Sequence, residues 1–227
     1  MVCDNTNIIV ICKNIDTLIA SNMKILSDYA IEHHNIQKIY FCDINSSDLT
    51  AEIINNQILP KTHFIGKFDD EREALNCVLP QLTSDNVIMI EGELYTRLHQ
   101  IRLQIKKLRK ASIILPNRFS KKSKTEWYNN KQMLGVKTDN LTFRMFSGLR
   151  FDDLTNTNKA FKRKQVLELL SETLNKEYLW PEMISLALKK GIRVSSIETH
   201  YIIKSDNNDD GVIKGIRRGI ELLRLKK

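Results

Sequence analysis

Short apolar runs alternate with amphipathic segments along the first half of the chain. Runs rich in β-branched and aromatic residues predict buried strands at residues 8–12, 39–42, 63–65, 87–90 and 112–115. Apolar positions at helical spacing predict helices over residues 15–33, 49–56, 70–79 and 95–109. Strands that alternate with helices are typical of a mostly parallel sheet flanked by helices, so the pattern predicts an α/β fold.

The second half has a less regular pattern. Residues 120–140 are polar and without a clear period, which predicts a mobile loop. Periodicity further predicts helices over 159–174 and 181–190, a strand over 192–203, an acidic loop over 205–211 and a basic amphipathic helix over 212–225. The chain has no G-x-G-x-x-G and no Walker loop, so dinucleotide-binding and P-loop folds lose their main support.

Cysteine usage and hydropathy indicate the compartment. The four cysteines are scattered and form no C-x-x-C pair, which makes a structural zinc site or a disulfide framework unlikely and favours a reducing compartment. The sequence shows no basic-then-apolar leader and no apolar run near the roughly 18 residues of a membrane-spanning helix. We therefore expect a cytoplasmic protein.

The net charge of +8 leaves several partners open. Lys and Arg crowd residues 97–137 and 214–227, which suits phosphorylated ligands, an anionic membrane or simply a solvated surface. Nucleic acid is not expected, because the chain has neither a recognition motif nor an aromatic stacking platform. The helix over 212–225 either packs its apolar stripe on the domain, which we favour, or makes a peripheral membrane contact.

Acidic side chains follow two of the predicted strands. Asp43 comes after the second strand, and Glu91 and Glu93 come after the fourth. Parallel sheets bind ligands at the carboxyl ends of their strands, and carboxylate oxygens suit Mg²⁺ or Mn²⁺. Glu91 and Glu93 flank Gly92, which leaves space for a ligand, and in an extended chain they point the same way. The alternative is a solvated turn at the end of a strand.

Four segments, in order, resemble the dolichol-phosphate-mannose-synthase-like branch of the family-two glycosyltransferases. The segment IYFCDINSSDLTAEII over 39–54 is similar to that family's strand–Asp-Asp-Gly-Ser–helix signature. The segment from Ala74 to Leu94 is similar to its A-L-N helix, strand and D-x-D-L motif, written here as E-G-E-L. N-R-F over 117–119 stands where the family has Ser-Arg-Tyr/Phe, and DLTNTNKAFKRKQVLELL from Asp153 resembles its D-x-T-S-G-F-R helix entry.

The resemblance implies a fold and an activity. The fold is the GT-A nucleotide-diphospho-sugar transferase fold, as one domain over 1–227 with a nucleotide-binding half (1–94) and an acceptor half with a C-terminal helix (95–227). The activity is transfer of a sugar, with inversion, from a GDP- or UDP-linked donor to an acceptor such as a polyprenyl phosphate, a lipid phosphate. Such a hexosyltransferase would use Mg²⁺ or Mn²⁺.

The resemblance also implies roles for individual residues. It assigns binding of the nucleotide sugar to Asn14, Asp43, Glu91, Lys204 and Lys214. It assigns metal binding to Glu91 and Glu93, and catalysis to Asp153 and Arg118. From the residues alone, Asp43 serves equally well as a loop cap and Arg118 as half of an ion pair.

Departures from the family's motifs leave a second hypothesis open. Only Asn14 remains of the motif after the first strand, both D-x-D carboxylates are Glu, and Asn156-Thr157-Asn158 replaces Ser-Gly-Phe. The alternative is a catalytically inactive relative that acts as a binding or scaffold protein.

Overall fold

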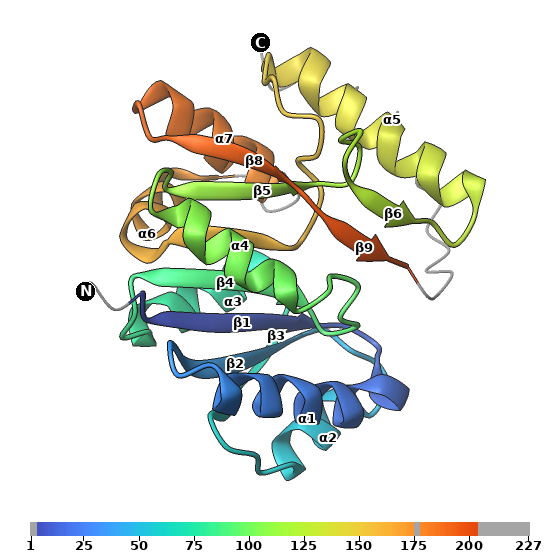
Figure 1. Cartoon of the computed structure of the whole chain (residues 1–227), viewed down its shortest axis with the longest axis vertical. Coiled ribbons are helices and arrows are strands. Elements are labelled where there is room, and N and C mark those ends of the chain that lie inside the picture. Colours follow the sequence, from blue (N-terminus) through green and yellow to red (C-terminus); the bar gives the residue numbers. More distant parts are fainter. Residues whose placement is uncertain (1–3, 175–177, 204–227) are drawn as a thin grey trace.

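The structure, a computed structural model, describes residues 4–174 and 178–203 (Figure 1). Along the chain the elements are β1 (Thr6–Cys12), α1 (Asp16–Glu32), β2 (Ile36–Ile44), α2 (Thr50–Asn56), β3 (Thr62–Phe68), α3 (Glu71–Val78), a 3₁₀ turn (Leu79–Gln81), β4 (Asn86–Glu91), α4 (His99–Leu108), β5 (Ile113–Asn117), β6 (Lys124–Glu126), α5 (Asn130–Ser147), β7 (Lys159–Lys162), α6 (Arg163–Glu172), α7 (Leu179–Lys189), β8 (Val194–Glu198) and β9 (His200–Ile202).

A seven-stranded sheet in the order β3-β2-β1-β4-β7-β5-β8 forms the centre, and β6 and β9 form a separate two-stranded sheet. β1 pairs in parallel with both β2 and β4, β2 with β3, and β5 with β8, whereas β7 runs antiparallel between β4 and β5. The prediction of a mostly parallel sheet flanked by helices is therefore confirmed.

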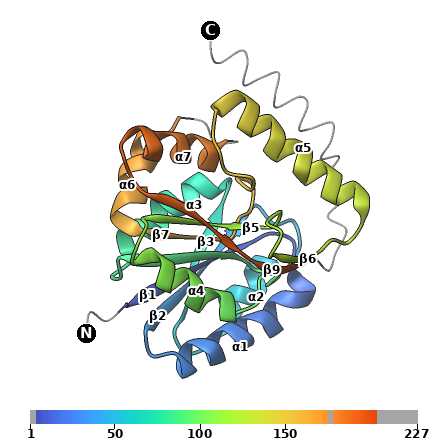
Figure 2. The same cartoon turned by 45° about the horizontal axis from the view of Figure 1, so that its top comes forward.

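The two faces of the sheet carry separate apolar cores. Strand alternation directs Ile9 and Met89 to the face covered by α3, α6 and α7, and Ile8 and Ile88 to the face covered by α1 and α4. Figure 1 shows α1 and α4 in front of the sheet. In Figure 2, α5 lies at the outer side of the molecule, and its Phe143 joins the core beside α7. These strands are almost continuously apolar in the sequence because helices cover both faces of the sheet.

The prediction of a loop over residues 120–140 was wrong. Its residues form β6 and the first part of α5. Asn129 caps α5 by accepting a hydrogen bond from the backbone N–H of Gln132 at 2.8 Å, and Gly148 ends it in the left-handed region at φ 68. The helix has no regular apolar face, with Leu134 and Leu141 exposed, so hydrophobic periodicity missed it.

The predicted helix over 159–174 was wrong at its start. Lys159–Lys162 is the strand β7, because Phe161 and Ala160 fill the gap between β4 and β5, and α6 begins only at Arg163. The predicted strand over 192–203 is two short strands, β8 and β9. The loop over 205–211 and the helix over 212–225 lie outside the described residues.

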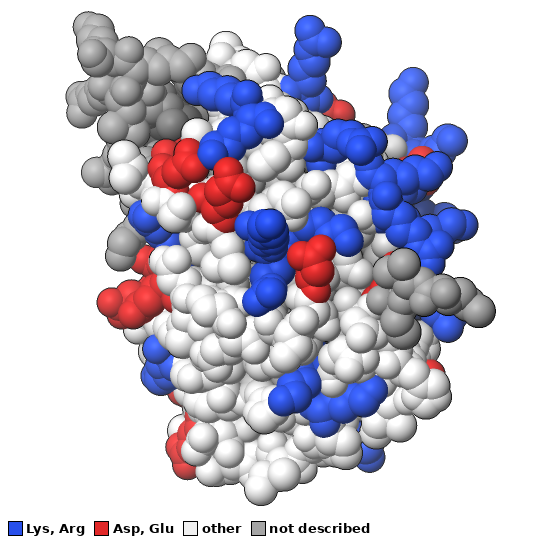
Figure 3. Space-filling view, turned by 90° about the vertical axis from the view of Figure 1, so that its left-hand side faces the viewer, with Lys and Arg blue, Asp and Glu red and all other residues white. Residues whose placement is uncertain are grey.

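Surface charge is uneven on the face that Figure 3 shows. Lys and Arg side chains gather most densely at the upper right of this view, and acidic side chains lie among the basic ones elsewhere. Within the described part of the chain, no helix has both the length and the apolar character needed to cross a membrane.

Candidate functional site

Three neighbouring parallel strands end together at one edge of the sheet. In the register of β1 with β2, Cys12 is opposite Asp43, and in that of β1 with β4, Ile11 is opposite Glu91. The last residues of β2 and β4 therefore carry Asp43 and Glu91 to the same edge as Asn14 and Glu93, which lie in the loops after β1 and β4. This edge is where open α/β sheets bind their ligands.

Hydrogen bonds join the loop after β1 to the loop after β2. Asn14, at φ 50, accepts from the backbone N–H of Ser47 at 2.9 Å, and its own N–H donates to Ser46 Oγ at 2.9 Å. Asp43 is fully buried and accepts from both the N–H (3.2 Å) and the hydroxyl of Ser46. Asn14 and Asp43, two of the predicted nucleotide-binding residues, thus order the loop after β2, and the capping role considered for Asp43 is present.

Gly92 brings the acid pair close against β1. Its N–H donates to the carbonyl of Ile11 at 2.8 Å, and its carbonyl accepts from Asn22 Nδ2 at 2.7 Å. A Cβ at this position would lie 2.5 Å from Ile15 Cδ1 and 3.0 Å from Cys12 Sγ. The expectation that Gly92 makes room for a ligand was wrong, since protein atoms take that space.

Glu91 ends β4 in a network of hydrogen bonds. Its Oε2 accepts from the hydroxyl of Tyr201 at 2.8 Å and from Asn158 Nδ2 at 3.3 Å, while its backbone N–H donates to Asn158 Oδ1 at 3.0 Å. Burial raises the pKa of Glu91, and the Tyr201 hydrogen bond and the charge of Arg118 oppose that rise. This carboxylate is fixed in orientation before any ligand arrives.

Glu93 holds its negative charge poorly. Burial, followed by repulsion from Glu91, raises the pKa of Glu93 to about 7. Both carboxylates have raised pKa values, and a cation bound between them would offset their mutual repulsion.

The acid pair fits a divalent cation that takes part of its coordination from a ligand. Within 4–174 and 178–203, no three His, Cys, Asp or Glu side chains form a cluster able to hold a metal ion. Mg²⁺ is commonly bound by one or two carboxylates together with substrate phosphates. Glu91 and Glu93 suit that arrangement and do not suit a cage made of protein ligands alone.

The two predicted catalytic residues, Arg118 and Asp153, bind each other. Arg118 Nε donates to Asp153 Oδ2 at 2.8 Å and Nη2 donates to Oδ1 at 2.7 Å, and the backbone N–H of Arg118 adds a third hydrogen bond at 2.8 Å. Both side chains are buried, at 6% and 0% exposure. The guanidinium carbon also lies 5.3 Å from the ring centroid of Tyr201 and 5.7 Å from that of Trp127. This ion pair supports the wall of the site, and the assigned catalytic roles stay predictions.

Three residues of this region were not predicted from the sequence. Tyr201 and Asn158 hold Glu91, and Lys159 lies fully buried behind them, 4.7 Å from the ring centroid of Trp180. Burial lowers the pKa of Lys159 to about 8, against the opposing charge of Glu71. Asn158 stands in the segment that replaces Ser-Gly-Phe, which was its only signal. Lys204 and Lys214 lie outside the described residues.

Comparison with known proteins identifies the fold. The sequence matches no protein-family model and no curated protein. Among solved structures, glucosyl-3-phosphoglycerate synthase from Mycobacterium tuberculosis in complex with phosphoglyceric acid is similar at a TM-score of 0.63 and 12% identity, over 96% of this chain and 79% of that chain. Mannosyl-3-phosphoglycerate synthase from Rubrobacter xylanophilus is similar at a TM-score of 0.61 and 12% identity, over 98% and 74%.

A third similar structure has another printed activity. It is 4-diphosphocytidyl-2C-methyl-D-erythritol synthase from Anaerococcus prevotii, at a TM-score of 0.54 and 13% identity, over 94% of this chain and 99% of that chain. The likenesses show that the chain has the GT-A fold of nucleotide-sugar transferases. None of these three structures is a dolichol-phosphate-mannose synthase, so that branch stays a prediction.

Proposed function

We propose that this chain is a glycosyltransferase that moves a sugar from a nucleoside-diphosphate sugar, linked to GDP or UDP, to an acceptor with inversion. The observation that carries the proposal is the Glu91–Glu93 pair at the end of β4, beside the Asp43 loop at the end of β2. In a GT-A fold this edge of the sheet is the natural place for a nucleotide and its diphosphate.

The chemistry follows from the charge that develops on the donor. Departure of a nucleoside diphosphate builds negative charge, and a bound Mg²⁺ or Mn²⁺ supplies the compensating positive charge. Glu91 and Glu93 would hold that ion, with Glu91 kept in orientation by Tyr201 and Asn158. Asp43 and Asn14 would shape the loop that receives the base and ribose. Lys204 and Lys214 are proposed to cover the diphosphate.

The acceptor is best supported as an anionic molecule. Both carboxylate oxygens of Asp153 accept hydrogen bonds from Arg118, which leaves Asp153 poorly placed to act as a general base. A phosphate or carboxylate acceptor needs orientation rather than deprotonation. A polyprenyl phosphate belongs to this class.

A catalytically inactive binding protein is the second candidate. It is favoured by the occupation of Glu91 Oε2 by Tyr201 and by the closed Arg118–Asp153 pair. Such a protein would bind the donor, or a partner, without turnover.

Calorimetry with UDP, GDP and their sugars, in the presence of Mn²⁺ or Mg²⁺, tests the main proposal. We expect saturable, metal-dependent binding to at least one donor, weakened roughly tenfold or more by Glu93→Gln and unchanged by Glu32→Gln, a matched change on the exposed end of α1. A folded sample that binds no donor contradicts the proposal. Donor hydrolysis or sugar transfer that disappears in Glu93→Ala eliminates the inactive alternative, whereas binding without turnover supports it.

A further inference from the structure

The small sheet of β6 and β9 has an inner and an outer face. On the inner face, Tyr201 reaches Glu91, and Thr125, its register partner, donates to the carbonyl of Arg118 at 2.9 Å. Side chains alternate along a strand, so His200 and Ile202 lie on the other face. That outer face is therefore separate from the acid pair.

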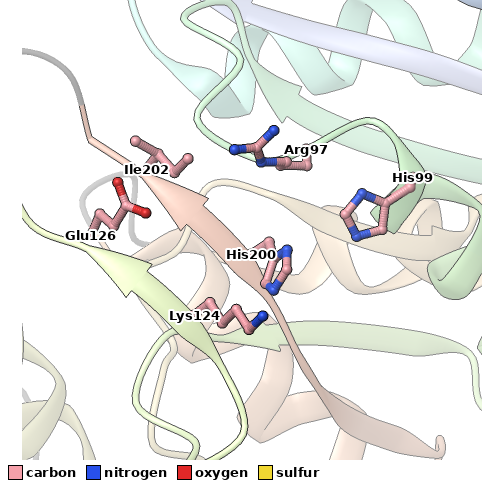
Figure 4. A pocket seen from close by; sticks show the side chains of 6 residues that line it. All are labelled: Arg97, His99, Lys124, Glu126, His200 and Ile202. Atoms are coloured by element: carbon pink, nitrogen blue, oxygen red, sulfur yellow. The ribbon is translucent and has the colours of Figure 1, made fainter.

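The outer face forms the floor of a pocket of about 410 Å³ (Figure 4). Its lining comes from three segments, namely β6, β9 and the residues at the start of α4. The lining residues are Arg97, His99, Lys124, Glu126, His200 and Ile202. Four of these six side chains carry, or can acquire, a positive charge.

Basic groups flank His200 on both sides. Lys124 is its register partner on β6, and on its other side the backbone N–H of Arg97 donates to the carbonyl of His200 at 3.4 Å. The His99 ring approaches the His200 ring edge-on, with 5.4 Å between centroids. Positive charges gathered this closely repel one another unless an anion lies between them. An arrangement that collects them in one pocket is typical of a site that binds an anion.

Glu126 is the one acidic side chain among the six that line the pocket, and it forms no ion pair with the basic ones. Arg97 and Lys124 form no ion pair with any residue in the described ranges. Burial, followed by the charges of Lys124, His99 and Arg97, lowers the pKa of His200, while Glu126 opposes that change. Three basic neighbours and one acidic neighbour therefore act on the imidazole.

We propose that this pocket binds the phosphate group of a small phosphorylated molecule, at a site distinct from the donor site. Arg97 offers two parallel N–H donors to phosphate oxygens, Lys124 a mobile point charge, and the two imidazoles further donors. Glu126 and Ile202 line the pocket as well, and the carboxylate there disfavours a second phosphate and accepts hydrogen bonds from hydroxyl groups. A phosphate monoester of a hydroxylated molecule therefore fits better than a polyphosphate.

Binding of glycerol 3-phosphate, with glycerol as the uncharged control, tests this proposal. Calorimetry on the full chain, together with histidine ring-proton NMR, is expected to show saturable binding of the phosphate ester, no binding of glycerol, and a raised pKa of His200 in the complex. Arg97→Ala and Lys124→Ala each weaken binding about tenfold. Lys106→Ala, the same change at an exposed site on α4 outside the pocket, leaves it unchanged.

The remaining outcomes identify the source of the phosphate and the place of binding. Co-sedimentation with vesicles that contain phosphatidate, lost in Arg97→Ala, assigns the phosphate to a lipid headgroup, and binding of the soluble ester alone assigns it to a free metabolite. The proposal is overturned if neither probe binds the folded protein, or if both pocket variants bind as the wild type does. Competition between glycerol 3-phosphate and a nucleotide-sugar donor, with Glu93→Gln abolishing both, also overturns it because the two would then share the acid site.

Discussion

The phenolic hydroxyl of Tyr201 donates to Glu91 Oε2 at 2.8 Å and so joins β9 to the end of β4. Tyr201→Phe removes this bond from an almost fully buried side chain. Since the hydrogen bond favours the charged carboxylate, its loss raises the pKa of Glu91 and lowers the free energy of unfolding by about 1–3 kcal/mol. Chemical denaturation at pH 8 measures the change. Tyr128→Phe, at a 52% exposed position, serves as the control and has no effect on stability.

The raised pKa of Glu93 makes stability depend on pH. The folded protein keeps this proton up to a pKa of about 7, whereas the unfolded chain releases it near the ordinary value of 4.5. The wild type therefore loses stability relative to Glu93→Gln as the pH rises from about 4.5 through 7, after which the difference is constant. Unfolding of both proteins between pH 4 and pH 9 checks the sign. A wild type that gains stability relative to Glu93→Gln as the pH rises refutes the prediction.

We expect the same titration to control the cation binding proposed for Glu91 and Glu93. Mn²⁺ requires the charged carboxylate, so Mn²⁺-dependent donor binding strengthens as the pH rises through about 7. Glu93→Gln both weakens this binding and removes the pH dependence. Calorimetry with donor and Mn²⁺ at pH 6 and pH 8 provides the measurement, and an equally steep pH dependence in the variant assigns the titration to another group.

Asp152 and Asp153 are adjacent in sequence, but we expect their substitution to reduce stability by very different amounts. Asp153→Asn leaves the buried guanidinium of Arg118 without its counter-charge and destabilises the protein by about 3–5 kcal/mol. Asp152→Asn breaks an exposed pair with Arg144 and costs less than about 1 kcal/mol. Denaturant unfolding of the two variants compares them directly, and equal effects would mean that the buried pair does not stabilise the fold.

Gly92→Ala tests the close contact between the acid pair and β1. The new Cβ would lie 2.5 Å from Ile15 Cδ1, which gives an overpacking penalty of about 1–3 kcal/mol and displaces Glu91 and Glu93. Ile15→Val removes that Cδ1 atom, so adding it to Gly92→Ala restores part of the lost stability. Thermal unfolding of the single and double variants measures the coupling, and strictly additive effects argue against the contact.

Sequence patterns predicted the strands that are buried on both faces and the helices whose apolar residues recur at helical spacing. The strand expected at 39–42 lies within Ile36–Ile44, and the helix expected at 49–56 is Thr50–Asn56. Both faces of the sheet are covered, so the apolar runs of the strands are unmistakable. Local caps at Asn129 and Gly148 were the available signal for α5, whose apolar residues follow no single face.

The candidate site was predictable only at the ends of strands. Asp43, Glu91 and Glu93 follow strong strand signals, and the topology brings them to one edge. Tyr201 could not be placed there from sequence, because its contact with Glu91 spans 110 positions and depends on a three-residue strand. The pairing of Arg118 with Asp153 spans 35 positions and likewise depends on tertiary structure.

The position of β7 between β4 and β5 has a consequence for synthesis of the chain. β4 pairs on one side with β1, but its other edge is completed only by Lys159–Lys162. While a ribosome makes the intervening residues, a nascent chain that has already folded its first strands presents Val87, Ile88 and Met89 on an open edge. Such edges promote intermolecular pairing and aggregation. The fold thus leaves this edge of its central sheet unprotected until residues 159–162 have been made.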